Sequence, residues 1–497
     1  MYNKFEVIII GAGPSGLMLS IELALRNISC AIIEKRKSRL IETRAFGLMP
    51  LTLNLLDMRG LANSMISEGI ICNYAPLGDG KGKLYFHSLK TKFPFLLSIP
   101  QEKTEEILEK RTIQLGVKIF NNYELLRFEE KNGDFLLFCK NKKEENIFIS
   151  RYLIGCDGSY SSVRNLAKIP FTFLKQNKTL MHGDVYLKYP PKDKIFAKTS
   201  KRGMIAIFPH KNGSYRAIAL DQKKMLIPVN TKLTLEDFSE SLISLSGGYN
   251  FGINNFIWLK RFRVQQKQSQ SYQKGKIFLL GDAAHTHMPA GGQGLQVAIH
   301  DAFNLGWKLA FYIKKKTSYN LLSSYTEERR KINEIAMKRS SMLFKYEIAN
   351  DIFSMSLKWT INKLFSFKFM QKYFAKDMSG LSTNYHKIFS KKKNYKKFKC
   401  LGYFIRDIKI YTHDNTLRFL YSFLKQGKFV FISIIHQISF ISWKNTDIIF
   451  LASDDIKKIY GVNCCLVRPD GIICWAGLDT KKFTKNIFYE IIFLKQE

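Results

Sequence analysis

The pattern of apolar and polar residues predicts alternating strands and helices in the first part of the chain. An apolar run over Phe5–Ile10 predicts a buried strand, and the apolar spacing after a glycine-rich turn predicts a helix over Pro14–Asn27. A second strand is predicted over Ser29–Glu34. Further helices are predicted over Leu51–Ser67 and over Gln101–Leu115. This order of elements indicates an α/β domain.

The middle of the chain has a different pattern. From about Leu174 to Arg263, short alternating runs separated by Asn-Gly and Pro turns predict an antiparallel sheet. A strand-like run at 276–281 then returns to the earlier pattern, and helices are predicted around Gly294–Lys315 and from Tyr325 to about Lys345. The β-rich segment therefore interrupts an α/β domain that resumes after it.

The last part of the chain divides once more. Residues 346–400 are aromatic and basic with a helical pattern, and 391–400 are predicted to be a solvated linker, with a nucleic-acid-binding tail as the alternative. Residues 401–497 are predicted to form a small separate α/β domain. Earlier in the chain, the glycine-rich run at 78–82 opens no helix and is therefore predicted to be a hairpin turn. The divisions are therefore 1–173, with a short hairpin of the β-sheet domain near 75–100, then 174–268, 269–390, 391–400 and 401–497.

Composition and charge narrow the class of protein. The 497 residues are 46% hydrophobic and 24% charged, a globular balance that excludes disordered and collagen-like chains. The formal net charge of +37 favours nucleic acid or an anionic membrane as a partner. Most basic residues are Lys, however, in a chain also rich in Ile, Asn, Tyr and Phe, which is the composition that AT-rich codons produce. We therefore interpret the charge as compositional and predict no nucleic-acid partner.

The sequence also bears on location. The amino terminus runs directly into a strand, without the layout of a signal peptide. The least polar later stretch, Phe429–Ser442, contains His436 and Gln437 and is shorter than the roughly 20 apolar residues that span a bilayer. The eight cysteines show no C-x-x-C spacing. We expect a cytoplasmic protein without an integral membrane segment or a metal site.

The first candidate site is the motif GAGPSG at residues 11–16. It follows an apolar strand and opens a helix, and Glu34 closes the next strand. Glycines at these positions allow a tight turn and let the backbone approach a pyrophosphate at the helix N-terminus. A carboxylate at Glu34 would bind ribose hydroxyls and repel a 2′-phosphate. The bound nucleotide is therefore predicted to be FAD or NAD rather than NADP.

A second motif, at residues 152–164, contains Asp157 and Gly158. By pattern alone it is a strand that meets an Asp-Gly turn, which is a common structural feature.

The third motif is the most informative. It reads GDAAH at 281–285 and PAGGQG at 289–294, and Asp301, Asn304 and Trp307 follow. A strand delivers Asp282 to its carboxyl end, where a carboxylate can hold a ribityl hydroxyl, and the glycine run opens a second helix. Two helix N-termini directed at anions suit a long cofactor with two ends, such as FAD.

At this point the chain resembles the class A flavin monooxygenases, the para-hydroxybenzoate hydroxylase-like family. The three motifs are similar to that family's fingerprints and occur in the same order. Residues 43–61 resemble its flavin-contacting loop, Gln101 stands at its cofactor-binding glutamine, and 324–331 resemble the helix after the flavin fingerprint. Residues 402–407 and 466–477 resemble the thioredoxin-like C-terminal domain of the phenol hydroxylase and polyketide hydroxylase branch.

The resemblance implies a fold and a reaction. The expected fold is α/β, with a Rossmann-like FAD-binding domain, an interleaved antiparallel β-sheet substrate domain and a C-terminal thioredoxin-like α/β domain. The expected reaction uses NADPH or NADH to reduce FAD, which takes up O₂ as a C4a-hydroperoxide and hydroxylates a phenolic or polycyclic aromatic molecule. The C-terminal domain is expected to pack against the rest, to contact a second copy in a homodimer or to cover the active site.

The resemblance also assigns residues. Arg44 and Pro289 are the expected catalytic residues. Arg44 would bind the pyrophosphate of FAD or the visiting nicotinamide cofactor, and Pro289 would form the wall beside the flavin. No catalytic base is identified. The implied cofactor-binding residues are Gly11, Gly13, Pro14, Ser15, Gly16, Glu34, Lys35, Arg44, Gln101, Asp157, Gly158, Gly281, Asp282, Pro289, Gly291, Gly292, Gly294 and Leu295.

The sequence indicates the substrate-binding residues less clearly than the cofactor-binding ones. His210, Tyr215 and Arg216 are candidates on the predicted sheet that roofs the flavin, and His285 is expected to be structural. Met288 and Gln296 depart from the family pattern, where proline and asparagine are usual. The pathway stays open between natural-product biosynthesis, antibiotic inactivation and aromatic degradation. A flavin halogenase is disfavoured, because none of the five tryptophans lies in a W-x-W-x-I-P pattern.

Overall fold

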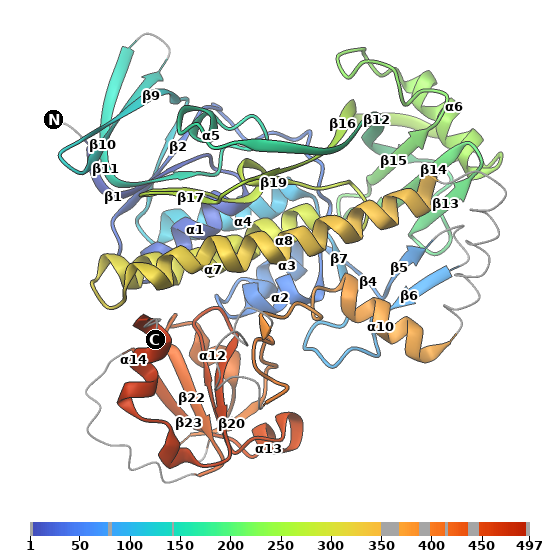
Figure 1. Ribbon diagram of the computed structural model, residues 1–497. Helices are drawn as coiled ribbons and strands as arrows, with labels where there is room; N and C mark the ends of the chain where they lie inside the picture. Colours follow the sequence, from blue (N-terminus) through green and yellow to red (C-terminus); the bar gives the residue numbers. More distant parts are fainter. Residues whose placement is uncertain are drawn as a thin grey trace.

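The computed structural model describes residues 3–77, 82–141, 144–348, 367–386, 398–412, 416–435 and 447–493. Figure 1 shows three parts: a sheet with helices against it, a second sheet beside the far end of a long helix, and a smaller C-terminal domain. Within the described ranges, none of the helices has the length and apolar character of a membrane span.

The first sheet is built around the predicted strand–helix–strand unit. It contains β1 (Asn3–Ile10), β2 (Cys30–Glu34), β8 (Lys118–Asn121), β9 (Glu124–Lys131), β10 (Asp134–Asn141), β11 (Glu144–Gly155), β17 (Gln273–Lys274) and β18 (Ile277–Leu279). Its path is β17-β18-β11-β1-β2-β8, and β10 and β9 extend from β11. β1 pairs in parallel with β2 and β11, and β11 pairs in parallel with β18. The two strands predicted near the N-terminus are confirmed.

Helices pack against this sheet and against one another. They are α1 (Pro14–Ala24), α2 (Pro50–Asp57), α3 (Ala62–Glu68), α4 (Gln101–Gln114), α5 (Ser162–Leu166), α7 (Gln293–Ile313) and α8 (Tyr319–Ile348), and α1 packs between α4 and α7. The predicted single helix over Leu51–Ser67 was wrong, because Gly60 takes a left-handed φ of 74° and separates α2 from α3. The predicted start of α8 at Tyr325 was also wrong. Leu321 is buried like Tyr325 one turn later, so the helix has a core-facing side from its first turn.

The second sheet, called the roof sheet here, is antiparallel as predicted. It contains β12 (Phe171–Leu187), β13 (Phe196–Ser200), β14 (Gly203–Pro209), β15 (Tyr215–Asp221), β16 (Ile253–Ser269) and β19 (His285–Thr286), in the order β13-β14-β15-β12-β16-β19. The segment also holds α6 (Leu235–Ser246), which the alternating pattern did not predict. The Thr234 hydroxyl accepts a hydrogen bond from the Asp237 N–H at its start, and Gly247 ends it with a φ of 80°.

The two faces of the roof sheet have different partners. On the outer face, Val185 and Ile205 pack with Phe238 of α6. On the inner face, Phe208 and Ile218 belong to an apolar cluster that also includes Met49, at the start of α2. This alternation follows from the period of two along a strand. The inner face is therefore turned toward the first part of the molecule.

Three small strands, β3 (Gly47–Leu48), β4 (Ile70–Cys72) and β7 (Leu96–Ser98), form a separate sheet, and β5 (Tyr74–Leu77) pairs with β6 (Gly82–Tyr85) as a hairpin. This hairpin lies at the start of the range 75–100 where one was predicted, and the residues of its turn, 78–81, lie outside the described residues.

The C-terminal domain has a six-stranded sheet, in the order β21-β20-β23-β22-β24-β25. Its elements are β20 (Lys409–Tyr411), β21 (Leu417–Phe419), α12 (Leu420–Leu424), β22 (Phe429–Ser433), β23 (Ile448–Ala452), α13 (Asp455–Tyr460), β24 (Cys464–Val467), β25 (Ile473–Gly477) and α14 (Lys485–Phe493), and α10 (Lys368–Met378) precedes it in the chain. The predicted α/β character is confirmed. Residues 391–397 of the predicted linker lie outside the described residues.

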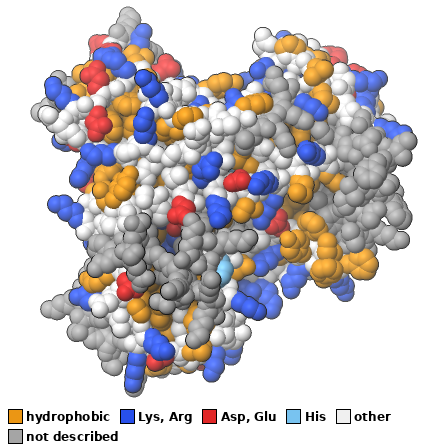
Figure 2. Space-filling model, viewed as in Figure 1, with side chains coloured by type: hydrophobic (Ala, Val, Ile, Leu, Met, Phe, Trp, Pro, Cys, Tyr) orange, Lys and Arg blue, Asp and Glu red, His pale blue; other side chains and the backbone are white. Residues whose placement is uncertain are grey.

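The positive charge is spread over the face of the molecule seen in Figure 2. Figure 2 shows Lys and Arg side chains scattered across the visible face, not gathered in one patch. This distribution agrees with the compositional interpretation of the charge, because a nucleic-acid footprint concentrates basic residues on one face or groove.

Candidate functional site

The three sequence motifs meet at one edge of the first sheet. β1, β11 and β18 end side by side, so the Cys156 N–H donates to the Ile10 carbonyl at 2.8 Å and the Leu280 N–H to the Gly155 carbonyl at 2.9 Å. The carboxyl ends of parallel strands share one edge, and ligands of such sheets bind there. The motifs are far apart in the chain, but the fold brings them together.

The glycines of the first motif differ in what surrounds them. A Cβ on Gly16 would overlap the carbonyl oxygen of Gly11, and one on Gly11 would overlap that of Cys156. Beside Gly13, in contrast, no heavy atom of the described chain lies within 4 Å of a built Cβ. Gly13 also begins α1, and no described side chain caps that N-terminus. The open space and the free N–H groups fit a cofactor pyrophosphate.

Glu34 lies at the end of β2 with its carboxylate next to this turn. Its Oε2 accepts from the Ala12 N–H at 2.7 Å, and its Oε1 accepts from the Arg36 side chain at 2.8 Å. Burial opposes ionisation, but the hydrogen bonds and charge of Arg36 outweigh it and hold the pKa of Glu34 below its ordinary value. The carboxylate is therefore ionised beside the first motif, while Lys35 points to solvent.

Arg44 and Asp282 face each other across the edge. Arg44 Nη2 lies 2.8 Å from Asp282 Oδ2, and the side chains are 52% and 32% exposed. Next to Arg44, the Ala45 N–H donates to Gln101 Oε1 at 3.3 Å. The structure thus brings together three predicted cofactor residues, Arg44, Gln101 and Asp282, from three different elements.

Arg216 supports this loop from the roof sheet. Its Nε and Nη2 bind the two oxygens of Asp184 at 2.6 and 3.0 Å, and its Nη1 donates to the carbonyl oxygens of Arg44 and Ala45 at 3.1 and 3.4 Å. The side chain is buried and its three nitrogens are all engaged. Arg216 therefore holds the Arg44 loop, a role that its position in the sequence did not suggest.

The other two candidate substrate residues, His210 and Tyr215, lie in different surroundings. His210 is buried near Asp184, and burial lowers its pKa to about 4, so its imidazole is neutral. Tyr215 packs with the outer cluster under α6, on the face away from Arg216. Neighbouring residues of a strand point to opposite faces, so Tyr215 and Arg216 could not both face a substrate. Of these two, only Arg216 lies on the inner face.

The third motif opens α7. Gly291 and Gly292 have φ values of 72° and 60°, and no described side chain caps the helix at Gly292. Around Gly294, no described heavy atom lies within 4 Å of a built Cβ. The Leu295 side chain is buried in the core, so only its backbone can face a ligand there. Pro289, in the loop before the helix, is exposed. A second uncapped helix N-terminus with open space fits the other end of a long cofactor.

Comparison with known proteins identifies the family. A family model described as an FAD binding domain matches residues 4–340. An uncharacterized aromatic compound monooxygenase of Bacillus subtilis is 32% identical, with 96% of this chain and 95% of that protein covered. The chain belongs to the class A flavin monooxygenases. A rifampicin monooxygenase of Rhodococcus hoagii is 28% identical, with 96% and 98% covered. The solved structure of an anhydrotetracycline hydroxylase from Streptomyces rimosus is 27% identical and has a TM-score of 0.86, with 99% and 100% covered.

In this flavin monooxygenase, the Asp-Gly motif joins the other two. Asp157 Oδ2 accepts from the Val163 N–H at 3.1 Å in the first turn of α5, whose N-cap is Ser161, and Gly158 has the left-handed φ of 80° that suits the predicted turn. Its Oδ1 is buried without a hydrogen-bond partner in the described part of the chain, and burial raises the pKa of this carboxyl. Arg164 of α5 donates to the Ala283 carbonyl at 3.0 Å. The motif therefore links α5 to the GDAAH turn.

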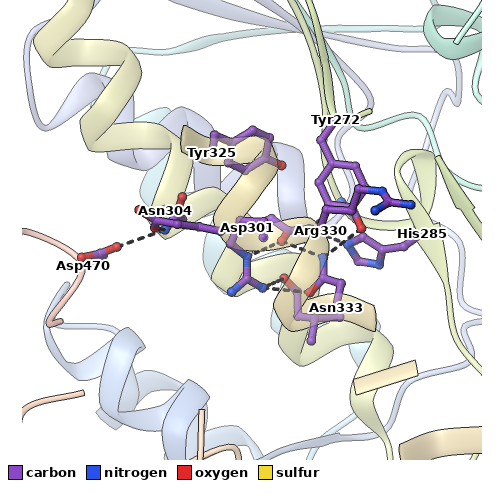
Figure 3. Close-up of polar contacts among 12 residues, drawn as sticks. Tyr272, His285, Asp301, Asn304, Tyr325, Arg330, Asn333 and Asp470 are labelled. Carbon is purple, nitrogen blue, oxygen red and sulfur yellow. Dashed lines mark hydrogen bonds and ion pairs between the residues drawn. The ribbon is translucent and has the colours of Figure 1, made fainter. Parts of the chain in front are cut away.

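Behind the turn of this flavin monooxygenase lies a buried network that was not predicted. In Figure 3, His285 and Asn333 converge on Asp301 of α7. Asp301 Oδ2 lies 2.6 Å from His285 Nε2 and accepts from the Gly281 N–H at 3.2 Å, while Arg329 of α8 binds Oδ1 at 2.6 Å. Burial opposes ionisation, but Arg329 and His285 hold the pKa of Asp301 well below its ordinary value.

The network shows what sequence reasoning missed. Asp301 and the 324–331 segment were both noticed in the sequence, but their pairing depends on how α7 crosses α8. A charged residue at a core position of a predicted helix is the signal that could have revealed it, because buried charges require partners.

Proposed function

We propose that this flavin monooxygenase hydroxylates a phenolic or polycyclic aromatic molecule with O₂ and NADPH or NADH. The observation that carries the proposal is the pair of helix N-termini, at Gly13 and Gly292, that no described side chain caps. FAD bound there supplies the transfer of reducing equivalents to O₂ and the delivery of one oxygen atom to the ring.

The proposed roles of the chain's residues follow from their positions. The α1 N-terminus binds the pyrophosphate, and Glu34 binds the ribose of the adenosine. The α7 N-terminus stabilises negative charge at the far end of the cofactor. Arg44 and Asp282 can each exchange their mutual ion pair for a cofactor group, since both are partly exposed. The remaining proposed contacts are those of Gly11, Pro14, Ser15, Gly16, Lys35, Gln101, Asp157, Gly158, Gly281, Pro289, Gly291, Gly294 and Leu295.

The proposed substrate side is the inner face of the roof sheet. An apolar cluster there includes Phe208, Ile218 and Met288, and the rings of Phe46 and Phe208 lie 4.2 Å apart. Apolar and aromatic surface suits an aromatic ring and excludes water from the oxygen transfer. Neutral His210, at the edge of this face, is a candidate hydrogen-bond partner for a substrate hydroxyl.

The test is oxidation of NADPH and NADH by the FAD-loaded protein across a panel of phenols, quinones and polycyclic aromatics, with mass detection of one added oxygen. We expect oxidation of the nicotinamide to be stimulated by some members of the panel and coupled to a product heavier by one oxygen. If the FAD-loaded protein oxidises neither cofactor with any compound, the proposed function is wrong.

Antibiotic inactivation is a second candidate, because a full-length relative is a rifampicin monooxygenase. Expression in a susceptible bacterium distinguishes the two. Inactivation predicts a higher inhibitory concentration of the antibiotic, and biosynthesis predicts no change.

Location, assembly and domain divisions are proposed with this function. All eight cysteines are buried and free, which supports a reducing, cytoplasmic location. We propose the divisions 1–173, 174–268, 269–390, 391–400 and 401–497 as functional units, with the last as a thioredoxin-like domain. A homodimer is checked by light scattering at several concentrations.

A further inference from the structure

A cavity of about 210 Å³ lies beside the first turn of α7 and borders the proposed substrate side. Its described lining comes from α2, α7, α8 and the segment after α10, and none of it from the roof sheet. Met49 and Met378 line the cavity and also belong to the apolar cluster under the roof. The cavity therefore shares a wall with the apolar cluster on the substrate side, while its described lining includes no residue of the roof sheet.

The charged side chains in the described lining of the cavity are cations, and a carboxylate behind that lining, Asp377, is bound by Arg339 and Ser382. The described lining includes the cations Lys331 and Arg339 and no carboxylate. Arg339 is paired with Asp377 at 2.7 Å. Lys331 is exposed, and no described carboxylate lies within ion-pair distance of it. The cavity thus presents at its edge the ammonium group of Lys331, which has no ion-pair partner in the described part of the chain, although Glu334 interacts with it at longer range, and this group favours an anion.

The rest of the lining suits a small ring. Val297, Ile332 and Ala336 supply apolar surface along α7 and α8, and Thr52 and Ser382 supply hydroxyl groups. An apolar cavity of about 150 Å³ is large enough to hold benzene. A cavity of this size therefore has room for one aromatic ring with a polar substituent.

Two glutamines connect this cavity to the flavin end of α7. Gln296 donates to the Gly47 carbonyl at 2.8 Å and accepts from the Met49 N–H at 3.1 Å. Gln293 donates to the Met378 carbonyl at 3.3 Å. Both side chains line the cavity and both lie in the first turn of α7. A ligand in the cavity would therefore contact the residues that hold the loop beside the flavin.

We propose that this cavity binds a small aromatic anion, a phenolate, at a site separate from the reaction chamber under the roof. The choice of a phenolate over another anion rests on the proposed function, since phenols are the class of substrate and product expected there. The phenolate oxygen would lie toward Lys331 and the ring between α7 and α8.

The test is equilibrium dialysis of the FAD-loaded, full-length protein with p-nitrophenolate, at a pH at which the probe is ionised. The neutral p-nitroanisole, which has nearly the same shape, is the matched probe without charge. We expect Lys331→Gln to weaken p-nitrophenolate binding about tenfold, because a charge-assisted hydrogen bond is lost, and to leave p-nitroanisole binding unchanged.

A second variant places a carboxylate in the lining of the same cavity. Ile335 lines the cavity and is 41% exposed, so Ile335→Glu adds a carboxylate without disturbing the core. It should weaken p-nitrophenolate binding by at least as much as Lys331→Gln. Lys338→Gln is the control, since Lys338 lies on the same helix, is 71% exposed and does not line the cavity.

The outcomes separate the two proposals. If p-nitrophenolate binds equally well to the unchanged protein, Lys331→Gln and Ile335→Glu, the cavity proposal is wrong. Failure of the protein to oxidise NADPH or NADH with any aromatic compound would refute the proposed function instead, and the two variants would still decide the cavity site.

Discussion

Asp282 shows how one side chain can serve both the protein and a ligand. It is held by Arg44, and yet about a third of its side chain is exposed just after the end of β18. Its backbone is fixed independently, because the Gly281 N–H donates to buried Asp301. This arrangement supports the proposed role of the carboxylate as the acceptor of a hydrogen bond from a cofactor hydroxyl.

Asp282→Ala should therefore lose FAD and keep its fold. Loss of a charged hydrogen-bond acceptor is expected to weaken FAD binding about ten- to a hundredfold. The measurement is the ratio of flavin absorbance to protein after dialysis, with circular dichroism as the check on folding. Asp193→Ala removes a similarly exposed ion pair, with Lys83 in the β5–β6 hairpin, and is the control. Full flavin retention by Asp282→Ala would show that the carboxylate has been misassigned.

Single residues also show where sequence reasoning stops. Glu34 was predicted beside the first motif, because it closes the strand that follows the glycine turn. The role of Arg216 could not be predicted, since its partners Asp184 and the Arg44 loop are set by strand register and by packing between parts of the chain. Local sequence patterns show which residue ends a strand, but they do not show which residues from distant segments come into contact.

At the scale of elements, the entry into α1 combines two kinds of glycine. Gly16 is required by packing, because its Cβ would overlap the Gly11 carbonyl. Gly13 has a φ of −77°, which any residue adopts, and its surroundings are open. The packing of the protein itself therefore does not explain a glycine at position 13.

This contrast predicts opposite results for two alanine variants. Gly13→Ala should keep the melting temperature and weaken FAD binding, since its methyl group would occupy the approach of the pyrophosphate. Gly16→Ala should lower the melting temperature of the apoprotein as well, because backbone atoms must move. Thermal unfolding with and without FAD separates the two effects. Equal FAD affinity in Gly13→Ala and the unchanged protein would contradict the pyrophosphate assignment.

Most elements near the motifs could be predicted, because strong apolar runs and glycine turns mark them. The break between α2 and α3 was missed, since the apolar stripe continues through Gly60 and hides the change of direction. α6 was missed because the alternating runs around it dominate the pattern, although Thr234 and Asp237 are a helix-start signal. Contacts between elements, such as α7 with α8, lie beyond the reach of such patterns.

At the scale of the whole molecule, buried charges join the C-terminal domain to the first part. Arg468 binds Glu328 of α8 with Nη1 and Nη2 at 3.1 and 3.0 Å, and Lys308 of α7 lies 3.0 Å from the same carboxylate. From the other side, Arg59 donates to the carbonyl oxygens of Leu424 and Pro469 at 2.9 and 3.0 Å. These side chains are buried, so water cannot replace a partner that is lost. They therefore hold the C-terminal domain against the first part of the molecule.

Arg468→Met should destabilise the protein strongly. It leaves Glu328 buried with one cation fewer, and breaking a buried ion pair costs about 3–5 kcal/mol. The measurement is the free energy of unfolding in urea, with Arg406→Met, an exposed arginine of the same domain, as the control. A change as small as that of the control would mean that the domain is not held by this pair.

The buried histidines predict loss of stability in acid. Burial lowers the pKa of His210 to about 4 and of His300 to about 3, and it also lowers those of His182 and His287. In the unfolded chain these histidines bind protons below about pH 6.5, whereas in the folded chain they stay neutral to a lower pH. Their contribution to stability is therefore unchanged above about pH 6.5 and falls toward pH 4. His210 alone accounts for about 3 kcal/mol.

Unfolding free energies measured across this range should show a shallower pH dependence for His210→Gln than for the unchanged protein. An identical slope in both would mean that His210 is not held neutral in the folded state.

The roof sheet is inserted into the first part of the molecule through only two long strands. The chain enters it along β12 and leaves along β16, which pair along most of their length, and every other strand of the sheet except β19 lies between them in the sequence. The segment between β12 and β16 can therefore be exchanged while the cofactor site stays intact, provided that Arg216 of β15 is kept, because it holds the Arg44 loop. Chimaeras that keep Arg216 and replace the other residues between β12 and β16 should change the substrate range without a change in the flavin site.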